Sequence, residues 1–179
     1  AGTLYTGFSE NYDGYSAVRL LTVNTTTAVK IRDMTYGSSG TKAFYYDPGV
    51  TADAAGNIFM SASRSSNSDY VSQTCVGLRP ADTAFPNATM LREGDATYWQ
   101  FRWGDYNGAA VDATTLGHGW VVGGYVDSKG NWATHASDAI FGSAHPSGAG
   151  GSAPQTPSLA STFTLVSETP AHPAIHFRL

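Results

Sequence analysis

The sequence predicts an all-β protein, and three observations support this prediction. Apolar and aromatic residues come in short runs broken by Gly, Asn, Asp and Ser, as in antiparallel strands joined by tight turns. No stretch has the 3.6-residue apolar period of an amphipathic helix. The 179 residues are 41% apolar and only 13% charged, which suits a single domain with its own core.

The first three strands are expected at 4–8, 16–23 and 29–34. The second run is apolar and β-branched, so we expect it in a sheet buried on both faces. The third alternates apolar and polar residues, as a half-buried strand does. Further strands are predicted at 49–52, 57–63, 70–78, 88–92, 98–103, 108–111, 119–125, 131–136 and 161–167.

An internal repeat is the most informative feature of the chain. Residues 49–53 form a short run of small residues that ends in Asp53, and a turn and a larger strand at 58–63 follow. Residues 108–112 end in Asp112 in the same way, before a second large strand at 120–125. The two aspartates are 59 positions apart (112 minus 53).

A shared turn pattern accompanies this repeat. Asp53-Ala54-Ala55-Gly56-Asn57 and Asp127-Ser128-Lys129-Gly130-Asn131 both read Asp-x-x-Gly-Asn before an apolar residue. Asp accepts hydrogen bonds from backbone amides a few residues on, and Gly takes up a positive φ without strain. Both segments are therefore predicted to be hairpin turns.

Repeated short-strand units of about 40 to 60 residues are typical of β-propeller blades. The small residues Gly108, Ala109 and Ala110 suit the crowded innermost strand of a blade. The chain has room for about three four-stranded blades, whereas propellers usually have four to eight. We therefore expect a partial propeller, or one completed by another chain; a β-sandwich is the alternative.

The segment 45–140 resembles bacterial secreted β-propeller proteins of the sialidase-like, Asp-box kind. The resemblance is carried by residues 102–112, read together with 120–125 and 131–134. The turn from Asp127 to Trp132 resembles an Asp box with one additional residue between Asp and Gly. Sialidases act through a Tyr nucleophile with a Glu partner, an Asp acid/base and three arginines; this sequence singles out no three of its seven arginines.

The chain is expected to form a propeller-like β domain over 1–141. A flexible loop rich in Gly, Ser and Pro is expected over 142–157. Residues 158–179 are expected to form a C-terminal strand and tail that pack on the same domain. The strand at 161–167 is expected to pair with an early strand and close the structure.

Composition excludes some functions and favours a location. A net charge of −4 with three lysines excludes strong electrostatic binding to nucleic acid or to an anionic membrane, and no apolar run approaches a membrane span. The start at Ala1, the Ser- and Thr-rich polarity and the glycosylation sequons at 24–26 and 87–89 favour a secreted, extracellular protein. Cys75 is the only cysteine, so the chain has no internal disulfide.

The candidate ligand-binding residues are Arg102, Trp103, Tyr106 and Trp120. An arginine near exposed aromatic rings suits the binding of a sugar or a carboxylate. The structural alternative is that Asp105 caps a turn at Gly104 while Trp103 and Tyr106 pack between sheets. Trp99 joins Trp103 and Trp120 as a candidate sugar-stacking surface.

The candidate catalytic residues are Glu93, Asp95 and Asp105, because glycoside hydrolysis needs two carboxyl groups. The alternative for the first two is a solvated loop. His135 is expected to face outward from a strand. His172 and His176 are separated by Pro173, so no histidine metal site is expected. Calcium in Asp- and Asn-rich turns is the one cofactor considered.

Two functions follow from these residues. The first is a non-enzymatic binding or interaction scaffold, with glycans as the candidate ligands. A second copy of the chain, or the remainder of a longer chain, is the candidate protein partner. The alternative is a sialidase-like or other glycoside hydrolase with part of its site outside this chain.

Overall fold

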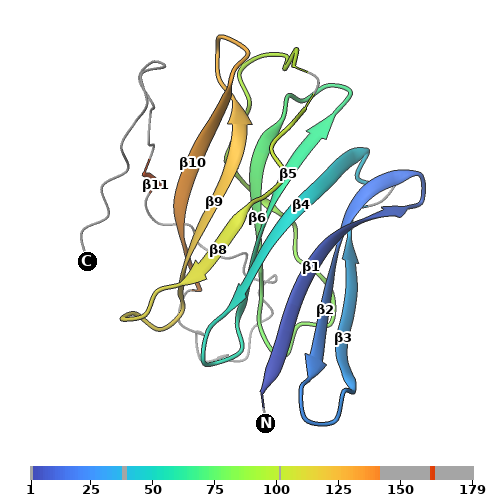
Figure 1. Cartoon of the computed structure of the whole chain (residues 1–179), viewed down its shortest axis with the longest axis vertical. Helices are drawn as coiled ribbons and strands as arrows, with labels where there is room; N and C mark the ends of the chain where they lie inside the picture. Colours follow the sequence, from blue (N-terminus) through green and yellow to red (C-terminus); the bar gives the residue numbers. More distant parts are fainter. Residues whose placement is uncertain (1, 38–39, 101, 142–161, 164–179) are drawn as a thin grey trace, which may run out of the picture.

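The computed structural model describes residues 2–37, 40–100, 102–141 and 162–163. These residues form eleven strands in three antiparallel sheets, and no helix occurs among them (Figure 1). The all-β prediction is therefore confirmed. Within each sheet the strands follow one another in sequence order.

We name the sheets by their order along the chain. The first sheet contains β1 (Thr3–Tyr12), β2 (Tyr15–Asn24) and β3 (Lys30–Tyr36). The middle sheet contains β4 (Ala43–Ala52), β5 (Ile58–Ser66), β6 (Ser72–Leu78) and β7 (Thr89–Arg92). The third sheet contains β8 (Gly108–Val111), β9 (His118–Val126), β10 (Trp132–Ile140) and β11 (Thr162–Phe163).

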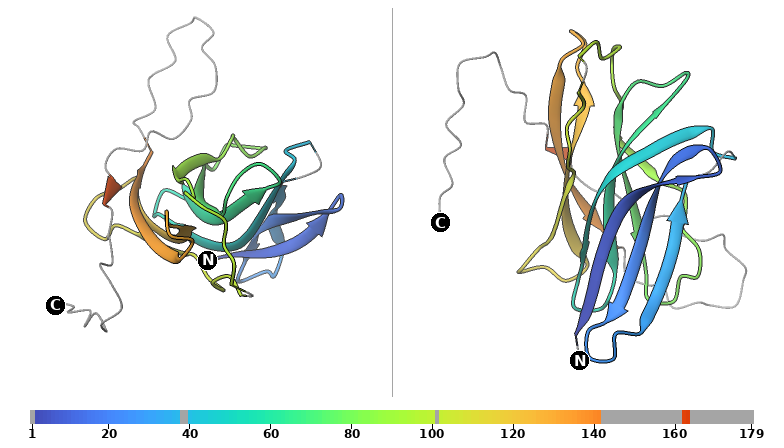
Figure 2. Two further views of the ribbon diagram at one scale, coloured as in Figure 1. Left: turned by 90° about the horizontal axis from the view of Figure 1, so that it is seen from above. Right: turned by 45° about the vertical axis from the view of Figure 1, so that its right-hand side comes forward.

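The middle sheet is covered on both faces, and the views in Figure 2 show the other two sheets on either side of it. Its residues Ile58 and Met60 face the first sheet, where they pack with Val18 and Leu20. Phe59 faces the other way and packs against residues of the third sheet, among them Val121 and Ala139. Successive side chains of β5 point to opposite faces of the sheet, so they contribute to two separate cores.

The two repeated segments occupy equivalent places in neighbouring sheets. Gly49 of β4 pairs with Ser61 of β5, and Gly108 of β8 pairs with Val122 of β9. Gly49 also lies against the backbone of Asn107, directly before β8. The first strands of the middle and third sheets therefore run side by side in the same direction.

The first sheet does not repeat this arrangement. Gly7 of β1 lies against Val50 of β4, and the Ser9 hydroxyl accepts the Asp47 N–H at 2.9 Å. These contacts pair rising residue numbers in β1 with falling ones in β4, so the two strands run in opposite directions. The first sheet also has three strands, not the four expected of each blade.

Both Asp-x-x-Gly-Asn turns form as predicted. Asp53 Oδ1 accepts the N–H groups of Ala55 and Asn57, each at 2.9 Å, between β4 and β5. Asp127 Oδ1 accepts the corresponding amides between β9 and β10, at 2.9 and 2.8 Å. Gly56 and Gly130 have φ values of +83° and +79°, which an L side chain rarely adopts.

One strand prediction was wrong, and so was the expected partner of another strand. No strand occurs among the described residues of 98–103, because this segment carries the chain from the middle to the third sheet. Thr162 and Phe163 pair with β10 rather than with an early strand, since β10 has a free edge next to them. The rest of 161–167 and the loop at 142–157 lie outside the described residues.

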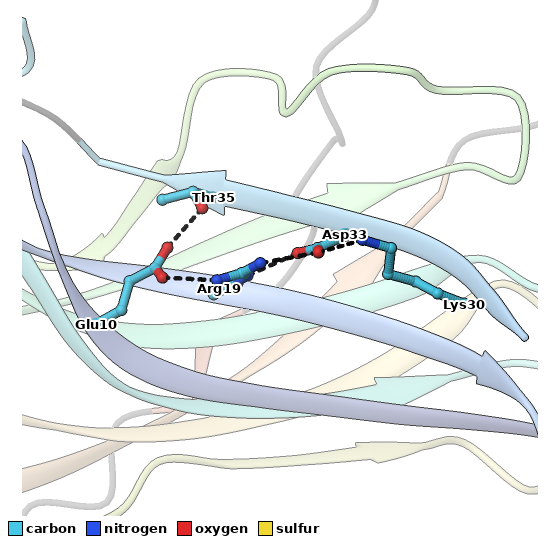
Figure 3. A network of polar contacts seen from close by, with 5 residues as sticks. All are labelled: Glu10, Arg19, Lys30, Asp33 and Thr35. Carbon is cyan, nitrogen blue, oxygen red and sulfur yellow. Dashed lines mark hydrogen bonds and ion pairs between the residues drawn. The ribbon is translucent and has the colours of Figure 1, made fainter. Parts of the chain in front are cut away.

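The strand at 16–23 was expected to be buried on both faces, but β2 buries only one face fully. Its other face carries Arg19, which bridges two carboxylates (Figure 3). Arg19 Nε lies 2.6 Å from Asp33 Oδ1, and Nη1 lies 3.2 Å from Glu10 Oε2. The hydrogen bonds from Arg19, with a further one from Lys30, hold the pKa of Asp33 well below its usual range.

Candidate ligand-binding site

Three loops meet at one end of the middle and third sheets, the upper end in Figure 1. They are the β5–β6 turn (67–71), the segment 93–106 that follows β7, and the β9–β10 turn (127–131). The Val126 N–H donates to the Val71 carbonyl oxygen at 3.1 Å, and the Asp95 N–H donates to that of Val126 at 2.8 Å. We call these loops together the loop cluster.

Two adjoining pockets open in the loop cluster. The first has a volume of about 270 Å³, and Arg64, Tyr70, Met90 and Glu93 are among its lining residues. The second has a volume of about 430 Å³ and is lined mainly by uncharged residues, Asn67, Thr97 and Tyr98 among them. Ser68, Asp69 and Tyr70 line both pockets, so the Tyr70 side chain lies at their boundary.

The charged groups of the first pocket differ in whether they have a partner within the protein. Arg64 Nη2 forms an ion pair with Asp69 Oδ2 at 2.7 Å, and the Ser66 hydroxyl donates to the same oxygen at 2.8 Å. The Ser66 hydrogen bond, then the Arg64 guanidinium, lowers the pKa of Asp69. Glu93 is exposed, and among the described residues its carboxylate has no hydrogen-bond or ion-pair partner.

Glu93 and Asp95, predicted as candidate carboxylates, have different surroundings. Asp95 forms an ion pair with Arg92 at 2.5 Å, and the Arg92 guanidinium lies 4.4 Å from the centre of the Tyr125 ring. Glu93 lines the first pocket, whereas Asp95 lines neither pocket. Only Glu93 therefore presents a free carboxylate to a bound molecule.

Aromatic side chains cover the rest of the loop cluster. Trp99 is 83% exposed and lies beside Gly130 of the β9–β10 turn, and Trp132 is 50% exposed. Trp103 is half-buried; its ring packs edge-on against Tyr98 at 5.0 Å, and its Nε1–H donates to the Ser63 hydroxyl at 3.3 Å. The glycine at position 124 makes room for the Trp103 and Trp132 indoles.

The structure brings three of the four predicted ligand residues together. Arg102 and Tyr106 lie on the same loop as Trp103, and both are largely exposed. Trp120 lies near the other end of β9, where its Nε1–H donates to Asp112 Oδ2 at 3.3 Å. It therefore lies apart from the loop cluster.

The alternative interpretation of this loop had Asp105 capping a turn and both aromatic residues packed between sheets, and it is confirmed for Trp103 alone. Trp103 packs between the sheets as expected. Tyr106 does not, since it is 88% exposed. The Asp105 carboxylate pairs with the Arg102 guanidinium three residues earlier.

Asp47 is a nearby carboxylate that the sequence analysis missed. It lies at an irregularity of β4 between Tyr46 and Gly49, with φ at +53°. Its carbonyl oxygen accepts the Asn107 side-chain N–H at 2.6 Å, next to the start of β8. Burial, then the Asp105 carboxylate, raises the pKa of Asp47. The run Asp-Pro-Gly at 47–49 is a turn signal that marks this break in the strand.

Below the loop cluster, polar side chains are buried between the middle and third sheets. His135 and Gln73 are fully buried, so the expectation that His135 faces outward was wrong. The Asn107 side chain donates to the Ser63 hydroxyl at 3.2 Å, and Ser137 is also buried there. The alternation of side chains along a strand shows which residues share a face of the sheet. It does not show which face the neighbouring sheet covers, and the prediction for His135 failed for this reason.

No group of three or more His, Cys, Asp or Glu side chains converges to hold a metal ion within the described part of the chain. His172 and His176 lie outside that part. None of the described elements is a helix of the length and apolarity needed to cross a membrane. Cys75 is buried beneath the third sheet.

No protein-family model matches the chain, and neither the curated proteins nor the solved structures give a match.

Proposed function

We propose that the chain is a binding scaffold that recognises carbohydrate through its loop cluster. The observation that carries this proposal is the exposure of Trp99 and Tyr106 in the loop cluster, with Trp132 exposed next to it. The loop cluster also holds the two pockets. Large aromatic side chains are normally buried, and those that stay exposed near a cavity are typical of binding sites. Their flat apolar faces suit the C–H faces of sugar rings.

The pockets provide the polar half of such a site. Hydroxyl and amide groups of Ser66, Asn67 and Thr97 line the second pocket. Its volume of about 430 Å³ falls within the roughly 300–1,000 Å³ usual for small-molecule sites. Tyr70, at the boundary, is 47% exposed and offers both a ring and a hydroxyl.

We further propose that the middle and third sheets correspond to two neighbouring propeller-like blades of the sialidase-like kind. The parallel course of β4 and β8, with their equivalent Asp turns, supports this arrangement. The first sheet, whose β1 runs against β4, packs as a layer of a β-sandwich does.

The outer face of the first sheet exposes Leu4, Phe8 and Ile31, and that of the third exposes Val122. We therefore propose that a second copy or the remainder of a longer chain covers these faces. An extracellular location is part of the same proposal. The exposed Asn87 sequon and the scarcity of lysine support it.

A glycan array followed by titration of intrinsic tryptophan fluorescence tests the binding proposal. Trp99→Ala and Trp132→Ala are expected to weaken binding of the best oligosaccharide at least tenfold each, because stacking area is lost. Tyr12→Ala is the matched control, since Tyr12 is 50% exposed on the first sheet, in β1. Equal affinities in all three variants would contradict the proposal.

A glycoside hydrolase is the second candidate, because Asp47 and Asp105 interact and the Asp47 pKa is raised. A carboxyl group with a raised pKa suits a general acid. Turnover of fluorogenic glycosides that Asp47→Asn and Asp105→Asn both abolish would support this function. Activity unchanged in both variants would exclude these residues as its catalytic pair.

A further inference from the structure

We propose that the first pocket selects a sugar that carries a primary ammonium group, so that the bound carbohydrate contains an amino sugar. This inference rests on the proposed carbohydrate site and names its ligand class. The juxtaposition that carries it is that of two exposed residues that line the first pocket, Tyr70 and Glu93. The Glu93 carboxylate has no hydrogen-bond or ion-pair partner among the described residues.

The charges of the first pocket favour a cation. Arg64 is its only basic lining residue, and Asp69 already pairs with that guanidinium at 2.7 Å. Glu93 therefore contributes one uncompensated negative charge at the pocket. An ammonium group there gains an ion pair and donates hydrogen bonds to the carboxylate.

The hydroxyl groups around the first pocket are already engaged in internal hydrogen bonds. The Ser72 hydroxyl donates to the Tyr70 carbonyl oxygen at 2.8 Å and accepts the Gly94 N–H at 2.9 Å. The Ser68 hydroxyl lies 3.1 Å from the hydroxyl of Ser66, which in turn donates to Asp69. Among the charged groups of the first pocket, Glu93 is thus the one whose hydrogen-bonding capacity is left for a ligand.

The same charges disfavour an anionic sugar. A sialic acid or uronic acid would bring its carboxylate against Glu93 and Asp69, while Arg64 stays engaged by Asp69. The second pocket has only Asp69 as a charged lining residue, so it suits a neutral neighbouring sugar unit. A ring stacked on Tyr70 lies at the boundary and connects the two pockets.

Isothermal titration with a glucosamine tetramer and with its fully N-acetylated counterpart tests this inference at slightly acid pH. The wild-type chain is expected to bind the free-amine tetramer about two- to fivefold more tightly, as an exposed ion pair allows. Glu93→Gln keeps the shape of the side chain and is expected to abolish this preference. Asp13→Asn, the same charge change in the β1–β2 turn, is expected to retain it.

The possible results separate this inference from the proposed function. Binding of both tetramers with equal affinity, or a preference that survives Glu93→Gln, overturns the amino-sugar assignment and leaves carbohydrate binding standing. Binding of neither tetramer, with no array ligand, overturns both proposals. A basic peptide that binds in a Glu93-dependent manner while both tetramers fail also overturns the assignment, because the ammonium then comes from a protein.

Discussion

The carboxamide of Gln73 lies 2.9 Å from Nδ1 of His135, across the interface between β6 and β10. With its nitrogen on that side, the carboxamide also donates to the His135 carbonyl oxygen at 3.1 Å. Its oxygen then accepts the Gly123 N–H at 2.9 Å. This contact joins the middle and third sheets through an imidazole whose other nitrogen, Nε2, has no partner among the described residues.

The buried imidazole makes stability depend on pH. Burial, then the positive charge of Arg92, lowers the pKa of His135 below its usual 6.5. The unfolded chain therefore binds the proton more readily, and stability falls as pH drops below about 6.5. Urea unfolding from about pH 7.5 to about pH 5 checks this.

His135→Gln serves as the control, since it removes the titrating group. This variant is expected to show a flatter pH profile than the wild type over the same range. Identical slopes in the two proteins would contradict the assignment to His135.

Two equivalent glycines are expected to respond differently to alanine. At Gly49 a Cβ would collide with the backbone of Asn107, so Gly49→Ala should lower the free energy of unfolding by about 1–3 kcal/mol. At Gly108 the nearest atom is 3.8 Å from such a Cβ, so Gly108→Ala should leave the isolated chain within about 0.5 kcal/mol. Chemical denaturation of both variants measures the difference.

The same pair tests whether another sheet covers the third sheet. If a second copy packs there as the third sheet packs on the middle one, Gly108→Ala disrupts the assembly without unfolding the chain. Light scattering then shows a smaller particle for this variant. An unchanged particle mass together with an equal loss of stability at both glycines would contradict the equivalence of the two strands.

Cys75 is expected to be unreactive in the folded chain. Burial raises the pKa of its thiol to about 12, so almost no thiolate forms at neutral pH. A thiol-specific chromogenic reagent should label it only after denaturant is added. Rapid labelling of the native protein would show that the middle and third sheets separate easily at this position.

The Asp127 turn is expected to support the aromatic surface. Asp127→Ala removes the acceptor of two backbone amides and should lower the thermal midpoint by a few degrees. Sugar binding should weaken as well, because Trp99 lies against this turn at Gly130. Asp53→Ala, in the matching turn at the far end of β5, is the control and should lower stability while leaving binding unchanged.

Local chemistry made much of the fold predictable. The Asp-x-x-Gly-Asn turns could be found from sequence because their side chains act within four residues. The expected strand at 108–111 coincides with β8. The orientation of β1 against β4 could not be predicted, since it depends on contacts between sheets such as Gly7 with Val50.

The candidate site was predictable in part, for a related reason. Arg102, Trp103 and Tyr106 all fall within positions 102–106, so the sequence alone groups them. Arg64 and Tyr70 are distant in sequence from residues 102–106. They reach the loop cluster because β5 ends and β6 begins there. Trp120 was grouped with Arg102, Trp103 and Tyr106 as a candidate ligand residue, but it lies near the start of β9, at the end away from the loop cluster.

Hydrogen exchange of the chain with and without the best-binding oligosaccharide tests the central claim most directly. Amides in 66–72, 93–106 and 127–132 are predicted to gain protection in the complex, while those of the first sheet stay unchanged. Protection confined to the first sheet, or to the region around Trp120, would contradict the assignment of the ligand site to the loop cluster.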